Sequence, residues 1–339
     1  MEAPVETRTA GSVPVSTPAY QVTWAGKDVS VTITPYVLSM TYIDHVHGES
    51  DELDLELEDI GGGWKDGWYP QKGDRLTVRI GYKGLPLMDC GDFEIEEFEV
   101  KGPPDTAHVR ALATGVTKSL RTRNSKAYEG RSLRDIAQDI AARHGLTVVG
   151  DVPDTRFSRV TQNQERDLGF LKRVAEEYGQ VFTVKGDQLI FMERSNLAER
   201  APSVTLSRRD LKSYSLRDKG LTTFKQARAC YDDPWEKTTH EGWAQGAGED
   251  GIGDSIKLTR RAQGADHARM QAQAALDKAN EARFEGTLEV VGNPALVAGN
   301  TVAVAGLGKL SGTYLVYSSR HKCSPGGGYT TEIEIRRGA

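Results

Sequence analysis

Apolar and polar residues alternate along much of this chain, and one alternating pattern occurs twice, at 73–95 and at 299–316. Each copy opens on a Gly-Asp or Gly-Asn turn, continues as a strand with apolar residues at every second position, and returns through a Gly-x-aromatic sequence. A third alternating segment follows, at 109–112 and at 331–335. Turn residues at matching points predict two versions of one small β-unit. Because Gly-Asp and Gly-Asn turns are common, a chance match of two hairpins is the alternative.

The segment 51–59 predicts a strand with one apolar and one acidic face, since leucines alternate with carboxylates. The leucines are Leu53, Leu55 and Leu57, and the carboxylates are Asp54, Glu56 and Glu58. A slip of one residue would expose all three leucines, so we expect the leucines in the core and the carboxylates directed away from it. The acidic face is either simply solvated, or it lines a channel or meets a basic partner.

A glycine-rich loop follows this strand and carries three aromatic residues, Trp64, Trp68 and Tyr69. Aromatic side chains offer a large apolar area together with a polar group. Three interpretations stay open: the loop binds sugar, it contacts a neighbouring subunit, or it covers the end of a barrel. We therefore take these aromatics and the three carboxylates Asp54, Glu56 and Glu58 as candidate partner-interface residues.

The hydrophobic period changes from 2 to 3.6 near Ser132 and returns to 2 near Val181. Ser132 followed by Asp135 is typical of a helix N-cap. The predicted elements are a helix over 132–144, a strand over 146–149, a helix over 164–178 and a hairpin over 181–192. These elements predict a distinct α+β insert over 121–200, and we expect it to be peripheral to both β-units.

Strand-like sequence resumes after the insert, and a long alanine-rich helix is predicted over 265–283. The polar, glycine-rich stretch 232–255 is typical of a long loop. The predicted fold class is thus α+β and mostly β, with two β-barrels, an inserted α+β unit and the long helix. The expected divisions are a flexible arm (1–19), the first barrel (20–120), the insert (121–200) and the second barrel (201–339).

Composition narrows the class of protein. The chain has 339 residues, of which 38% are hydrophobic and 27% charged, so two or three domains and a polar surface are expected. No apolar run is long enough for a transmembrane helix, so we expect no membrane insertion. The net charge of −5 provides no basic surface for stable nucleic-acid binding. The three widely spaced cysteines, Cys90, Cys230 and Cys323, indicate synthesis in a reducing compartment.

The sequence contains no recognisable catalytic or metal-binding motif. His45-x-His47 and His321-x-Cys323 offer four metal ligands, but nothing in the sequence brings the two segments together, and no CxxC or HExxH motif accompanies them. The stretch 306–311 lacks the spacing of a phosphate-binding loop, and no GxSxG nucleophile motif occurs. We therefore predict a protein that is not an enzyme, with no catalytic residue, cofactor or metal.

The order of elements resembles the late-control D family, the hub proteins of contractile phage tails. The resemblance lies in residues 130–137 (GRSLRDIA), 163–171 (NQERDLGFL) and 288–306, and it covers roughly 20–338. Related architecture occurs in phage-tail-like bacteriocins and type VI secretion spikes. The resemblance implies barrels like those of tail-tube proteins, in a particle assembled in the bacterial cytoplasm.

The same resemblance implies a homotrimer in which three chains with two barrels each form a pseudo-six-fold ring. Such a ring joins a hexameric tail tube protein to a trimeric central spike protein and contacts other baseplate proteins. No spike or lysozyme domain follows the second β-unit, so a separate spike protein is expected. Two other functions stay open: a tail-associated cell-wall hydrolase, and a carbohydrate- or receptor-binding module that uses the aromatic loop. The sequence does not distinguish a true phage from a DNA-free particle.

Overall fold

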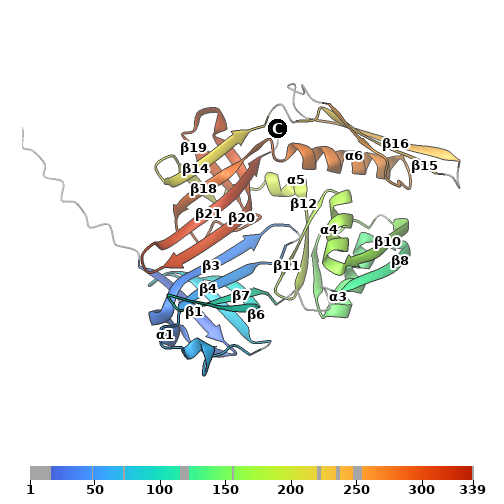
Figure 1. The fold of residues 1–339 in the computed structure, drawn as a ribbon. Helices are drawn as coiled ribbons and strands as arrows, with labels where there is room; N and C mark the ends of the chain where they lie inside the picture. The colour runs from blue at the N-terminus through green and yellow to red at the C-terminus, as the bar shows by residue number, and fades with distance from the viewer. Residues whose placement is uncertain are drawn as a thin grey trace, which may run out of the picture.

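The fold is built around one large sheet formed by two copies of the same β-unit (Figure 1). The computed structural model describes residues 17–47, 49–71, 73–114, 122–154, 156–219, 223–233, 237–246 and 254–337. Most of the predicted N-terminal arm, 1–19, lies outside these residues, and its last two residues already belong to the first strand. Within the described part, no helix is both long and apolar enough to cross a membrane.

The first β-unit pairs its strands in the order β3-β4-β7-β6-β5-β1-β2. Its strands are β1 (Pro18–Trp24), β2 (Lys27–Asp28), β3 (Val37–His45), β4 (Glu52–Glu58), β5 (Arg75–Tyr82), β6 (Met88–Lys101) and β7 (Thr106–Ala113). Its short helical turns are α1 (Ser30–Ile33), η1 (Thr34–Tyr36) and η2 (Gly63–Lys65). The core contains Leu53, Leu55 and Leu57, each fully buried, so the predicted register of the acidic strand is confirmed.

The second β-unit pairs its strands in the order β14-β18-β21-β20, and β19 continues from β20 to β13. Its strands are β13 (Val204–Ser207), β14 (Leu211–Asp218), β18 (Phe284–Val291), β19 (Thr301–Ala305), β20 (Gly312–Ser324) and β21 (Gly328–Arg337), with the turn η4 (Gly308–Leu310). The two units join edge to edge because β20 pairs with β3 over Ser318–Cys323 and Met40–His45. One sheet therefore passes through both units.

The irregularities of the two units match as well as their strand order. Ladder β6·β7 has a bulge between Ile95 and Glu97, and ladder β20·β21 has one between Val316 and Ser318. Ladders β3·β4 and β14·β18 share a second bulge, after Val37 and after Leu211. Bulges are retained structural features of a fold, so bulges at matching positions indicate two copies of one unit. The predicted repeat of one β-unit is confirmed.

The insert has its own hydrophobic core, separate from those of the β-units. Its elements are β8 (Arg123–Ser132), α3 (Leu133–His144), β9 (Thr147–Gly150), β10 (Arg156–Arg166), α4 (Asp167–Glu177), β11 (Gln180–Lys185), β12 (Gln188–Glu193) and α5 (Arg194–Ala198). The predicted cap is present, since the Asp135 N–H donates to Ser132 Oγ and the Ser132 N–H donates to Asp135 Oδ2. Helix α4 begins at Asp167, not at 164, because 156–166 pairs with β8 as a strand.

The prediction of a loop over 232–255 was wrong for residues 232, 233 and 255, which belong to the flanking strands, and for residues 238–245. Residues 238–245 form β16 (Thr238–Gln245), which pairs with β15 (Gln226–Asp233), and β17 (Ser255–Leu258) pairs with the other edge of β15. Helix α6 (Ala265–Asn280), which ends before the predicted 283, packs along β15 and β16 (Figure 1). A Cβ at Gly242 would lie 2.0 Å from the Arg269 backbone nitrogen, so only glycine permits this approach. Contact with the helix therefore stabilises a strand that the polar sequence does not indicate.

Candidate functional site

The polar face of the sheet carries the three candidate carboxylates of β4. His108 Nε2 lies 3.4 Å from Asp54 Oδ1, and Arg110 donates to Glu52 Oε2 at 2.8 Å. Partial burial raises the pKa of Asp54, and the neighbouring His108 opposes the shift. Glu56 is exposed and accepts a hydrogen bond from Ser39, while Glu58 is half-buried. The basic groups nearest to this acidic face thus come from the adjacent strand β7.

The polar face continues across the junction between the β-units. A cross-strand row passes from Glu52 on β4 through Ile43 on β3 to Arg320 on β20. It continues through Glu332 on β21 to Glu289 on β18. Residues directly opposite each other on paired strands share one face of the sheet. The face therefore extends across both units and carries charges of both signs, with the apolar Ile43 at the junction.

The three candidate aromatics lie at one end of the first β-unit and differ in exposure. The Trp64 ring is buried and stacks on Trp24, with ring centroids 5.8 Å apart. Trp68 is 45% exposed and Tyr69 is 53% exposed, and they line or border a cavity of about 390 Å³ with Tyr36. Trp64 is thus part of the core, and Trp68 and Tyr69 present the exposed aromatic surface.

A buried charged cluster joins the insert to the first β-unit. The ammonium of Lys185, on β11, contacts Asp44 and lies 2.6 and 2.7 Å from the two carboxylate oxygens of Asp51. Burial raises the pKa of Asp51 to about 6, although Lys185 opposes the shift. Burial alone would lower the pKa of Lys185, but the two carboxylates outweigh it and raise the pKa. The sequence alone did not predict this cluster. Its one signal in the sequence is Asp44, which occupies the inward-facing position of β3 that follows Met40 and Tyr42.

His47 forms a second connection between the same two parts. Its Nδ1 accepts the Phe182 N–H at 3.0 Å, so the ring carries its proton on Nε2 and donates it to Glu176 at 2.9 Å.

His321 is buried elsewhere, where it contacts the Tyr329 hydroxyl and the Leu296 carbonyl. Burial lowers the pKa of both imidazoles, that of His321 to about 4. In the described ranges, no group of three or more His, Cys, Asp or Glu side chains is arranged to hold a metal.

Comparison with known proteins identifies the family of this chain. A sequence profile described as "Phage tail baseplate hub (GPD)" matches residues 90–326. This chain belongs to the phage tail baseplate hub family. The match includes all three segments on which the resemblance to the late-control D family rests, so that resemblance is confirmed.

The family assignment agrees with a curated relative and with solved structures. The "Probable baseplate hub protein" of Escherichia phage P2 is 31% identical over 215 residues, which cover 61% of this chain and 55% of the relative. The chain thus spans about half the length of the curated relatives that it matches. The 43 kDa tail protein of prophage MuSo2 from Shewanella oneidensis has the same fold, with a TM-score of 0.72 at 15% identity over 95% of this chain and 98% of that one.

A more distant fold match is the Escherichia coli protein c3393, described as a type VI secretion component similar to the T4 tail proteins gp27 and gp5. Its TM-score is 0.54 at 14% identity, over 90% of this chain and 74% of that one. The mostly β fold predicted for this hub protein is therefore that of phage tail proteins.

Proposed function

We propose that this hub protein is a homotrimer that joins a hexameric tail tube to a trimeric central spike. The observation that carries the proposal is the repeat of one β-unit, with matching strand order and bulges, inside a single continuous sheet. Three chains with two such units present six similar units around one axis, while the trimer keeps true three-fold symmetry for the spike. The role is structural, without catalysis.

In this trimer the polar face of the sheet lines the axial channel, and the insert over 121–200 lies outside the ring. A surface of mixed charge in the channel would limit sticking of passing cargo, because neither sign dominates over a large area. The insert, with its own core, would contact other baseplate proteins. Particle assembly in the bacterial cytoplasm belongs to the same proposal.

The exposed pair Trp68 and Tyr69 is proposed as a contact with another baseplate protein. Both side chains border the cavity at the end of the first β-unit, and aromatic side chains are enriched at protein interfaces. Binding to a glycan is the competing role for the same surface. A glycan array probed with the wild type and with Trp68→Ala distinguishes the two, since specific binding lost in the variant would favour the glycan.

The number of chains per tail particle tests the proposed function. We expect three copies of this chain in each particle, measured by quantitative mass spectrometry and by the symmetry of the assembled baseplate. Six copies, or a stable two-fold dimer, would contradict the trimeric hub. Clearing of a peptidoglycan gel by the purified protein would contradict the absence of catalysis.

A further inference from the structure

The junction between the two β-units inside one chain provides a template for a junction between chains. Strand β20 is shared by two neighbours along one edge: β19 pairs with Gly312–Leu315, and β3 pairs with Ser318–Cys323. Its opposite edge pairs with β21. The second half of β20 is therefore the part that receives the next β-unit.

Strand β6 is the equivalent of β20 in the first unit, but the second half of β6 has one partner fewer. Its first half pairs with β5 as far as Glu94, and its other edge pairs with β7 through Lys101. Over Glu97–Lys101, no strand of the described residues pairs with the edge that β5 leaves. In the second unit, β14 is the equivalent of β3, and it pairs with β18 alone among the described strands.

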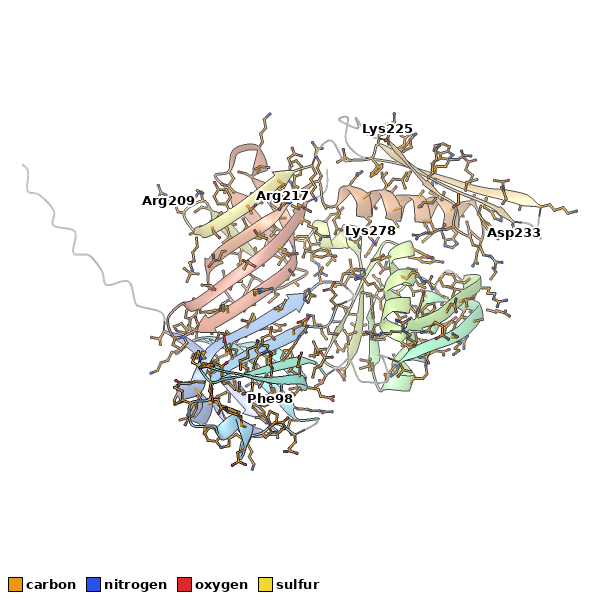
Figure 2. All side chains as sticks on the ribbon, in the orientation of Figure 1. Phe98, Arg209, Arg217, Lys225, Asp233 and Lys278 are labelled. Atoms are coloured by element: carbon orange, nitrogen blue, oxygen red, sulfur yellow. The ribbon has the colours of Figure 1, made fainter. Side chains whose placement is uncertain are left out.

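The two edges do not meet within one chain. Phe98 on β6 belongs to the first unit and Arg217 on β14 to the second, in separate parts of the sheet (Figure 2). Unpaired strand edges are surfaces prepared for another strand. Extending the proposed function, we infer that β6 residues 97–101 of one copy pair with β14 residues 215–219 of the next copy, antiparallel, as β20 pairs with β3.

The matching bulges determine the register of this pairing. Glu97 follows its bulge as Ser318 follows its own, so the two residues are equivalent. Ser39 and Ser213 are equivalent by the same argument, and counting forward makes Lys219 the equivalent of His45. Because Ser318 lies opposite His45 within the chain, Glu97 lies opposite Lys219 between chains.

The side chains brought together by this register are complementary, although the register was derived from the backbone alone. On the polar face, Glu97 meets Lys219, which also pairs with Glu285 of its own chain. Glu99, which also pairs with Lys101 of its own chain, meets Arg217. On the other face, Val100 (38% exposed) meets Leu216. Opposite charges and apolar side chains in directly facing pairs stabilise a sheet.

The same register contains one less favourable pair. Phe98 meets Asp218, whose carboxylate lies 3.5 Å from Arg283 within its own chain. The contact joins two different surfaces, so it closes a ring rather than a two-fold dimer when the rotation allows.

Disulfide trapping in assembled tail particles tests the register. Val100→Cys/Leu216→Cys is made in a Cys230→Ser chain, because Cys90 and Cys323 are already buried. Oxidation should give dimer and trimer bands on a non-reducing gel, and each single-cysteine chain should give none. Particles that contain three copies but yield no cross-linked bands would overturn the register while leaving the trimeric hub intact.

Charge reversal provides a second test that does not depend on a disulfide. Glu99→Arg and Arg217→Glu should each weaken subunit association about tenfold per junction, because attraction becomes repulsion. The double variant should return to within about twofold of the wild type. Arg209→Glu, in the turn before β14, is the matched control and should leave association unchanged. Equal weakening by the control, or no recovery in the double variant, would overturn the pairing. Particles without three copies would instead refute the proposed function.

Discussion

The ammonium nitrogen of Lys185 lies 2.6 Å from Asp51 Oδ2, and this ion pair connects the insert to the first β-unit. The same ammonium contacts Asp44, which also accepts the Ala298 N–H of the second β-unit at 2.8 Å. The cluster of Lys185, Asp44 and Asp51 therefore connects three parts of the chain that are remote in sequence, with Asp44 making the contact to the second β-unit. Loss of a cation from such a cluster leaves buried carboxylates without compensation.

Lys185→Met should destabilise the protein by about 2–3 kcal/mol. This lies below the range of about 3–5 kcal/mol for breaking a fully buried pair, because the lysine side chain is 33% exposed. Urea unfolding measures the change. Lys309→Met, at an exposed turn, is the matched control and should change stability by less than about 0.5 kcal/mol. Equal effects of the two substitutions would contradict the role of the cluster.

His321 should make the protein less stable as the pH falls from 6.5 toward 4. Burial lowers the pKa of this imidazole to about 4 from 6.5, so the unfolded chain binds a proton that the folded chain excludes. The stabilisation that neutral His321 contributes is fully present above pH 6.5. It is lost as the pH falls from 6.5 to 4, at up to about 1.4 kcal/mol per pH unit.

His321→Gln should remove that contribution from the pH slope, as measured by chemical denaturation at several pH values. Asp51 acts in the opposite direction, because the pKa of its carboxyl is raised from 3.8 to about 6 in the folded state. Its protonated form stabilises the folded state fully below pH 3.8, and this stabilisation is lost as the pH rises through 6. The comparison is therefore made between variant and wild type at each pH. An unchanged slope in His321→Gln would refute the assignment.

Gly242→Ala should release β16 from α6. The added Cβ would lie 2.0 Å from the Arg269 nitrogen and 2.2 Å from the Ala268 carbonyl carbon, so the backbone must move. We expect a loss of about 1–3 kcal/mol and faster proteolysis in 238–245. Gly169→Ala, in α4 with no atom within 4 Å of the new Cβ, should instead stabilise by about 0.5–1 kcal/mol. A neutral Gly242→Ala would refute the close packing.

Trp64→Ala should mainly lower the stability of the protein, and Trp68→Ala should mainly lower its assembly into particles. Trp64 is buried against Trp24, and removal of a buried tryptophan side chain costs about 3–5 kcal/mol. Trp68→Ala should cost less in thermal unfolding and should reduce incorporation of the protein into particles. Ile60→Ala, at another exposed apolar residue, is the control for incorporation. Incorporation of Trp68→Ala at the wild-type level would argue against a partner contact there.

Local patterns in the sequence determined the elements of this protein and the faces of its strands. A period of 2 is enough to place Leu53, Leu55 and Leu57 in the core, because a register slip would expose all three together. The capping box at Ser132 depends on neighbours three residues apart, so the start of α3 was also predictable. The repeated glycine turns likewise predicted the repeated β-unit, since turn geometry is a property of a few adjacent residues.

Only the tertiary structure decided which elements meet. Any strand edge presents the same backbone donors and acceptors, so the sequence alone did not select β3 as the partner of β20. Strand β16 depends on the fit of Gly242 against α6, and the ion pair of Lys185 with Asp51 joins residues 134 apart. Such contacts form when the chain folds back on itself, and their energies depend on burial that no local pattern specifies.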